Sequence, residues 1–109
     1  MKIGKEFKFD AGHHLPNYQG KCNRPHGHTW KVTVTKRGTV EESSGMVMDF
    51  NDLNDLVKPI IEELDHAYLN AIVPNPTCEN IASYIADRLG GEFSVRVQEG
   101  EGGWAEMEE

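Results

Sequence analysis

Apolar and polar positions alternate along the first third of the chain. Residues 2–12 alternate, and the largely β-branched run 29–35 does the same until the chain reaches Gly38. Strict alternation is typical of strands that bury one face. Because turn-forming residues 16–20 lie between the two runs, we expect a long antiparallel pair of strands joined by an ordered loop.

The middle of the chain changes to helical spacing. Residues 45–50 predict a short extended piece, and Asn51 and Asp52 suit the start of a helix. Pro59 is expected to kink this helix or loosen one turn. The apolar residues from this point recur every third or fourth position, as on one face of a helix: Leu53, Leu56, Val57, Ile60, Ile61 and Leu64.

A second helix and two short strands complete the pattern. Thr77 is a good N-cap, and Glu79 suits the first turn of the helix that follows. Gly90-Gly91 closes this helix, residues 93–99 alternate again, and residues 104–107 read as a last strand. The apolar stripe of the second helix consists of Ile81, Ala82, Ile85, Ala86 and Leu89.

The order of elements is therefore ββααββ, which predicts an α+β protein with a four-stranded sheet in a single domain, residues 1–109. Both helices can cover only one face of that sheet. The other face needs a cover that the chain does not supply, so we expect the protein to form oligomers.

Composition narrows the class of protein. The chain has 109 residues, no apolar run of the roughly 20 residues that cross a membrane, and no signal-like start. Cys22 and Cys78 are too few for a disulfide framework, so we expect free thiols in a reducing, cytoplasmic compartment. We therefore expect no membrane partner.

The charge is unevenly distributed. The net charge of −7 argues against binding to nucleic acid. Residues 1–37 nevertheless carry eight basic and two acidic side chains, a balance of +6, whereas residues 38–109 carry three basic and 16 acidic ones, a balance of −13. This asymmetry fits a basic hairpin beside acidic helices, or a local site for a small anion.

Histidines cluster in the basic third. His26 and His28 head the second strand on the same face, and His13 or His14, which point to opposite faces, ends the first. Such a pair is often only solvated or packed. Three converging neutral imidazoles without a fourth protein ligand are, however, the layout of a catalytic zinc site.

Other reactive side chains have open interpretations. Cys22 can be interpreted as a fourth zinc ligand, as a catalytic thiol or as an inert small residue. The cations Lys21 and Arg24 near it would stabilise a thiolate. Asp65-His66 is a proton shuttle with its orienting carboxylate, or a helix cap. Glu99, at a strand end, is solvated or, if buried, suits a bidentate contact to an amino-pyrimidinone. Cys78 is expected to be buried.

Six motifs, in order and over nearly the whole chain, resemble the 6-pyruvoyltetrahydropterin synthase / QueD family. They are Phe7-x-Phe9-Asp10-Ala11-Gly12-His13-x-Leu15-Pro16, Lys21-Cys22-x-x-x-His26-Gly27-His28, Gly45-Met46-Val47-Met48-Asp49-Phe50, Leu64-Asp65-His66-x-x-Leu69-Asn70, Pro76-Thr77-x-Glu79-Asn80, and Glu99.

The resemblance implies a tunnelling fold (T-fold), an antiparallel four-stranded sheet with two helices on one face. Three subunits would close a twelve-stranded barrel, and two trimers would stack as a homohexamer with active sites at subunit interfaces. It also implies Zn²⁺ as the cofactor, with His13, His26 and His28 as its ligands.

The resemblance further assigns roles to individual residues. Cys22 becomes the catalytic thiol, and Asp65 with His66 completes a proton relay that a neighbouring subunit often supplies. Glu99 matches the carboxylate that anchors the pterin ring, and Thr77 lies in the segment that closes its pocket. For the triphosphate of the substrate, we expect contacts from Lys21 and Arg24.

Three residues separate Cys22 from His26, a spacing that resembles the queuosine branch of the family. The implied reaction converts 7,8-dihydroneopterin triphosphate into 6-carboxy-5,6,7,8-tetrahydropterin, acetaldehyde and triphosphate, which makes the protein a carbon-carbon lyase. The alternatives are a 6-pyruvoyltetrahydropterin synthase, a phosphorus-oxygen lyase that eliminates triphosphate and keeps the side chain, and a zinc- or pterin-binding protein without catalysis.

Overall fold

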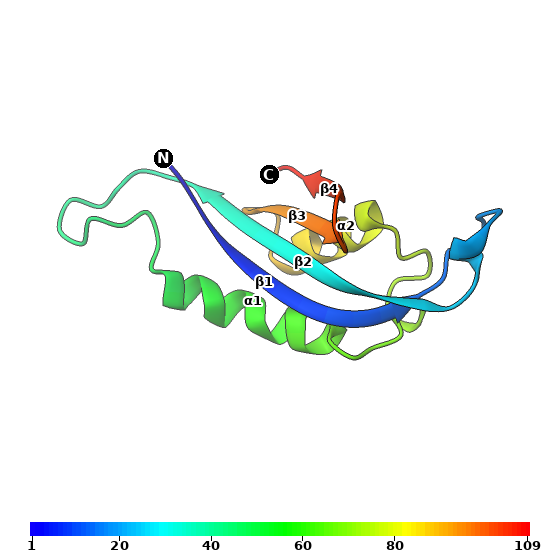
Figure 1. Ribbon diagram of the computed structural model, residues 1–109. Coiled ribbons are helices and arrows are strands. Elements are labelled where there is room, and N and C mark those ends of the chain that lie inside the picture. Colours follow the sequence, from blue (N-terminus) through cyan, green and yellow to red (C-terminus); the bar gives the residue numbers. More distant parts are fainter.

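A long pair of antiparallel strands, β1 (Lys2–His13) and β2 (His26–Arg37), spans the molecule (Figure 1). The computed structural model describes residues 1–109. β3 (Ser94–Glu99) and β4 (Gly103–Met107) extend the sheet in the order β1-β2-β3-β4, and every neighbouring pair is antiparallel. The predicted strands are thus confirmed, and β2 continues back through the histidines to His26.

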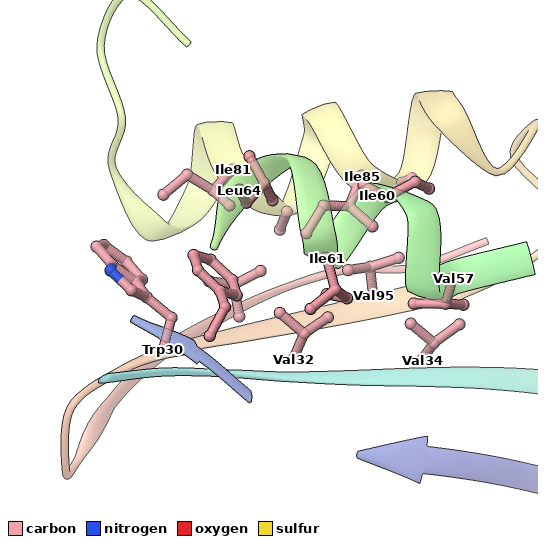
Figure 2. Close-up of a cluster of buried hydrophobic side chains, with 14 of the residues drawn as sticks. Trp30, Val32, Val34, Val57, Ile60, Ile61, Leu64, Ile81, Ile85 and Val95 are labelled. Atoms are coloured by element: carbon pink, nitrogen blue, oxygen red, sulfur yellow. The ribbon is translucent and has the colours of Figure 1, made fainter. Parts of the chain in front are cut away.

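Two helices, α1 (Phe50–Leu64) and α2 (Cys78–Arg88), cover one face of this sheet, as predicted (Figure 1). Strand residues such as Val32 and Val95 face helix residues such as Ile61 and Ile85 (Figure 2). Each side chain of this size stabilises the fold by about 1.5–3 kcal/mol when it is fully buried. Leu56, which was expected in the stripe, is instead 49% exposed, because the buried face of α1 runs through Leu53, Val57, Ile60, Ile61 and Leu64.

The start of α1 differs from the sequence prediction. Asp49 is the N-cap, and its carboxylate accepts a hydrogen bond from the Asn51 amide at 2.8 Å. The expected extended piece at residues 45–50 is therefore wrong, because this segment turns into the cap and Phe50 is already helical. The helix also runs on through Pro59, whose exposed position leaves the unpaired carbonyl one turn earlier to water.

The ends of α2 follow the prediction. Thr77 is its N-cap, and the hydroxyl oxygen accepts a hydrogen bond from the Asn80 amide at 3.1 Å. At the other end Gly90 and Gly91 have φ of 81° and 80°, a conformation that side chains disfavour. The Gly91 amide donates to Ala86 O at 3.2 Å and closes the helix.

The face of the sheet opposite the helices is polar, and no element of the chain covers it, as expected. Alternation places charged and hydroxyl side chains there, with Trp104 against Arg96 as the exception. This face can meet water unaided. Its residues include Lys2, Glu6, Lys8, Asp10, Thr29, Lys31, Thr33, Thr35, Arg37, Arg96, Gln98 and Glu106.

The outer edge of β1 is covered at one end only. After α1 the chain passes along this edge, where the His66 amide donates to Asp10 O at 2.6 Å and the Gly12 amide donates to Ala67 O at 3.1 Å. The part from Lys2 to Lys8 keeps an open edge. As for membranes, neither helix has the length and apolar character needed to span one.

Candidate metal centre

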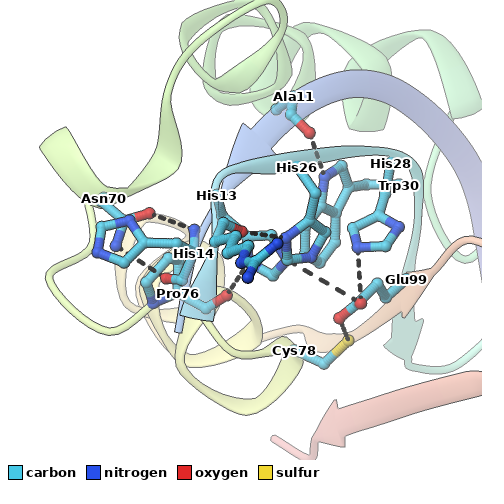
Figure 3. A network of polar contacts seen from close by, with 11 residues as sticks. Ala11, His13, His14, His26, His28, Trp30, Asn70, Pro76, Cys78 and Glu99 are labelled. Atoms are coloured by element: carbon cyan, nitrogen blue, oxygen red, sulfur yellow. Dashed lines mark hydrogen bonds and ion pairs between the residues drawn. The ribbon is translucent and has the colours of Figure 1, made fainter. Parts of the chain in front are cut away.

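Three imidazoles converge where β1 ends and β2 begins (Figure 3). His13 lies opposite His26 in the strand register, and His28 lies two residues further along β2 on the same face. The ring centres of His13 and His26 are 4.6 Å apart, and those of His26 and His28 are 4.7 Å apart. The predicted convergence of three histidines is therefore observed.

Backbone carbonyls orient two of these rings. His13 Nδ1 lies 2.8 Å from Pro76 O, and His26 Nδ1 lies 2.7 Å from Arg24 O. Because a carbonyl oxygen only accepts, each Nδ1 carries the proton and each Nε2 keeps a lone pair. This is the arrangement that fixes the tautomer of metal-binding histidines.

Glu99 brings a carboxylate to the same place. His13, His26, His28 and Glu99 each offer a ligand atom, and these four atoms lie within 4.8 Å of one another. We call them the four-ligand group. Within it, His13 Nε2 and His28 Nε2 are buried without a hydrogen-bond partner, which is costly unless something else satisfies them. This group could hold a metal ion.

Burial keeps His13 in the form that binds metals. Its side chain is completely inaccessible, and this burial is the main reason why the pKa of His13 is lowered, against the opposing effects of the Pro76 carbonyl and Glu99. Trp30 lies beneath the group and donates from its indole N–H to Ala11 O at 3.1 Å. The histidine is therefore rigidly placed and neutral.

Of the two candidate histidines at the end of β1, the structure brings His13 into the four-ligand group and leaves His14 outside. The His14 backbone exchanges hydrogen bonds with the Asn70 side chain, both at 2.9 Å. The His14 ring contacts the Tyr68 hydroxyl. His14 thus fastens the segment after α1 to β1.

Cys22 lies in the short 3-10 turn η1 (Lys21–Asn23), half-buried and outside the four-ligand group. Its carbonyl accepts from the Leu15 amide at 2.7 Å, which ties the turn to the end of β1. Lys21 and Arg24 are exposed on either side. Both cysteines are free, as predicted.

Asp65 and His66 form the expected carboxylate–imidazole pair, also outside the four-ligand group. Asp65 Oδ2 is 2.9 Å from His66 Nδ1, and Asp65 Oδ1 accepts from the Asp10 amide at 2.9 Å. The Asp10 N–H, and next His66, lower the pKa of Asp65. The His66 side chain is 79% exposed, so the ring faces solvent, and its backbone φ of 60° is in the left-handed region that side chains rarely adopt.

Comparisons with known proteins agree on one family. The family model described as 6-pyruvoyl tetrahydropterin synthase matches residues 2–109. A putative 6-carboxy-5,6,7,8-tetrahydropterin synthase of Archaeoglobus fulgidus is 41% identical over 111 residues, 98% of this chain and 95% of that protein. A dihydroneopterin monophosphate aldolase of Pyrococcus furiosus is 41% identical over 81 residues, 74% of this chain and 68% of that protein.

The chain belongs to the 6-pyruvoyl tetrahydropterin synthase family. The solved structure of Caenorhabditis elegans 6-pyruvoyl tetrahydropterin synthase matches it with a TM-score of 0.90 at 25% identity, covering 100% of this chain and 95% of that one. The expected T-fold of the subunit is thereby confirmed. The protein is an enzyme, a lyase of the pterin synthase family, as the resemblance implied.

Sequence reasoning for this family member missed three features of the site. The carbonyls of Arg24 and Pro76 leave no signal in the side-chain pattern. The third feature is the position of Glu99 among the imidazoles, beside the buried Cys78. A signal for it existed, since Glu99 pairs with Trp30 in the sheet register, two residues from His28 on the same face.

Proposed function

We propose that this enzyme is a zinc-dependent 6-carboxy-5,6,7,8-tetrahydropterin synthase. It would convert 7,8-dihydroneopterin triphosphate and water into 6-carboxytetrahydropterin, acetaldehyde and triphosphate, a step toward queuosine and related 7-deazapurines. The observation that carries this proposal is the four-ligand group with its two unpartnered imidazole nitrogens, in a chain of the pterin synthase family.

Zinc is the metal that this donor set favours, because neutral imidazoles suit zinc better than magnesium or calcium. His13, His26 and His28 would hold it through Nε2. When bound, zinc supplies a Lewis acid that polarises the side-chain oxygens of the substrate.

Proton transfer is assigned to the chain's own side chains. Cys22 and His66 would move protons at the side-chain carbons and the ring of the substrate. Asp65 holds His66 Nδ1 at 2.9 Å and leaves Nε2 available. Because His66 is exposed, we propose that it serves the site of a neighbouring subunit.

The substrate would be held at three points. The Glu99 carboxylate, with a side chain 28% exposed, is open on one side to the amino-pyrimidinone edge of a pterin. We assign Thr77 to the edge of the pterin pocket because it follows Pro76, whose carbonyl holds His13. Lys21 and Arg24 are free to meet the triphosphate, in keeping with the basic character of residues 1–37.

Open sheet edges support assembly into a homohexamer, a dimer of trimers. β1 and β4 are the edge strands, and the outer edge of residues 2–8 has no backbone partner. Unpaired edges are templates for another chain, so β1 of one copy would pair with β4 of the next and close a barrel. Its interior would be lined by the polar face. The two free thiols accord with a cytoplasmic setting.

Product analysis tests the activity. We expect incubation with 7,8-dihydroneopterin triphosphate to release acetaldehyde and triphosphate together with 6-carboxytetrahydropterin. Triphosphate release without acetaldehyde would identify a 6-pyruvoyltetrahydropterin synthase. Turnover only with the monophosphate would favour the activity for which the Pyrococcus relative is named. A protein that binds zinc and pterin but forms no product would be a binding protein.

A further inference from the structure

Glu99 lies closer to the imidazoles than a role in pterin binding requires. Its Oε1 is 2.8 Å from His28 Nε2 and 4.0 Å from His13 Nε2. Two ligand atoms on a tetrahedral zinc ion are roughly 3.3 Å apart, given zinc–ligand bonds of about 2.0–2.1 Å. The two separations bracket that value, so the carboxylate oxygen has the spacing of a fourth ligand.

A hydrogen bond does not explain this approach. His28 Nε2 and Glu99 Oε1 have the separation of an ion pair, yet His28 Nε2 is buried and makes no hydrogen bond. His13 Nε2, on the other side of Oε1, is also buried without a partner. Two buried imidazole nitrogens that make no hydrogen bond and face one carboxylate oxygen are typical of a site built around a shared cation.

The second carboxylate oxygen is held separately. Glu99 Oε2 lies 4.0 Å from the sulfur of Cys78 in the first turn of α2. The Cys78 thiol is the donor of this contact, and a thiol is a weak donor. This contact turns Oε1 toward the imidazoles, while a part of the Glu99 side chain stays accessible to a ligand.

We propose that Glu99 is the fourth zinc ligand of the substrate-free enzyme and leaves the metal to bind the pterin ring when substrate enters. The exchange rests on the proposed function. One carboxylate oxygen cannot bind the metal and the ring at once, so substrate side-chain oxygens take the position it vacates. Zinc and the pterin ring therefore compete for Glu99, and each weakens the binding of the other.

Cobalt(II) in place of zinc reports the ligand change directly. We expect the ligand-field spectrum of the substrate-free protein to change on Glu99→Gln, and zinc affinity, measured against a chelator, to fall about tenfold or more. The matched control is Glu101→Gln, two residues along on the exposed turn, which should change neither. If Glu99→Gln keeps the wild-type spectrum and affinity, the proposal is wrong.

Pterin without a side chain tests the exchange, because it can engage Glu99 but lacks the side-chain oxygens that would take the vacated position on the metal. Added to wild-type cobalt protein, it should shift the spectrum toward that of Glu99→Gln and weaken zinc binding. Pterin that binds without altering the spectrum would overturn the exchange alone. A protein that binds no pterin would overturn both the exchange and the proposed function.

A second variant shows whether the length of the Glu99 side chain matters, independently of its charge and of any folding defect. Glu99→Asp keeps the negative charge and withdraws the carboxylate by one methylene. We expect it to show the same spectral change as Glu99→Gln, with unchanged circular dichroism. A wild-type spectrum for Glu99→Asp would show that the carboxylate acts at a distance and would contradict direct coordination.

Discussion

The four-ligand group and the Asp65–His66 pair are built in opposite ways. The His13 ring is inaccessible to solvent and fixed by a carbonyl, whereas the His66 side chain is 79% exposed and its ring is held only by Asp65. Neutral imidazoles can be buried at modest cost, while an ionised carboxylate beside a proton carrier must stay near water. One chain therefore brings together a group that could hold a metal ion, whereas it leaves the proposed proton-transfer group His66 facing outward.

Because of this difference, we expect some substitutions to abolish turnover while metal binding is kept. Substitutions of the three histidines of the four-ligand group should remove both, and substitutions of Cys22 or His66 should remove turnover alone. The following variants test that separation, beginning with the largest expected effect.

His26→Ala removes a ligand and should abolish both properties. We expect zinc affinity to fall more than about a hundredfold, with turnover reduced to background. Metal analysis after dialysis measures zinc binding, and product formation measures turnover. His14→Ala is the matched control, because His14 lies on β1 beside a ligand but contacts Asn70 and Tyr68. Loss of zinc from His14→Ala, or its retention in His26→Ala, would contradict the assignment.

Glu6→Pro should separate the subunits. Alternate residues of β1 point their amides to one edge, so Glu6 N–H points outward as those of Asp10 and Gly12 do. Proline removes this donor and blocks strand pairing. We expect smaller assemblies by light scattering, zinc content unchanged, and turnover lowered about a hundredfold or more.

Glu6→Gln is the control for that experiment. It removes the ion pair between Glu6 and Lys31, 2.6 Å apart, but keeps the amide, so it should assemble as the wild type does. A Glu6→Pro protein that is monomeric and fully active would show that one chain suffices for catalysis.

Cys22→Ala should lower turnover about 10²–10⁴-fold, the usual contribution of a proton-transferring group. Zinc content and affinity should not change, because Cys22 lies outside the four-ligand group. X-ray absorption at the zinc edge provides the independent check. Sulfur bound to zinc in the resting protein would instead favour a structural zinc site, and unchanged turnover would remove Cys22 from the mechanism.

Charge reversal at Lys21 or Arg24 should have the smallest effect. We expect each substitution to glutamate to raise KM about tenfold at low ionic strength with little change in kcat. Added salt should reduce the difference in KM between variant and wild type. Lys2→Glu, an exposed basic site at the other end of β1, is the control. If Lys2→Glu raised KM equally, substrate binding would depend on the net charge of the protein and not on Lys21 or Arg24.

Sequence patterns predicted the fold well because burial imposes them. The alternation of β1 and β2 and the apolar stripes of both helices arise because each element buries one face. Thr77 and Gly90-Gly91 mark the two ends of α2 through local backbone chemistry. Asp49 was missed as a cap because two further polar residues follow it closely.

The second sheet face was predicted only in part. The count of helices predicted that no element of this chain covers it, but the expectation did not use the chemistry of that face, whose polar residues alternate with the core residues.

The part of the site that could be predicted from the sequence is the pair of histidines on one strand. His26 and His28 followed from the two-residue period, but the choice of His13 over His14 did not. Pro76 O, Arg24 O and the approach of Glu99 depend on how distant segments meet, which no local pattern records.

Mixing two inactive variants tests the central claim, that one chain completes the metal centre and a neighbour completes catalysis. Cys22→Ala and His66→Ala chains would be refolded together in equal amounts and assayed for 6-carboxytetrahydropterin. If Cys22 and His66 of one site come from different subunits, roughly a quarter of the sites in random mixtures carry both residues. The account predicts recovery toward a quarter of wild-type turnover, and a mixture as inactive as either variant alone would contradict it.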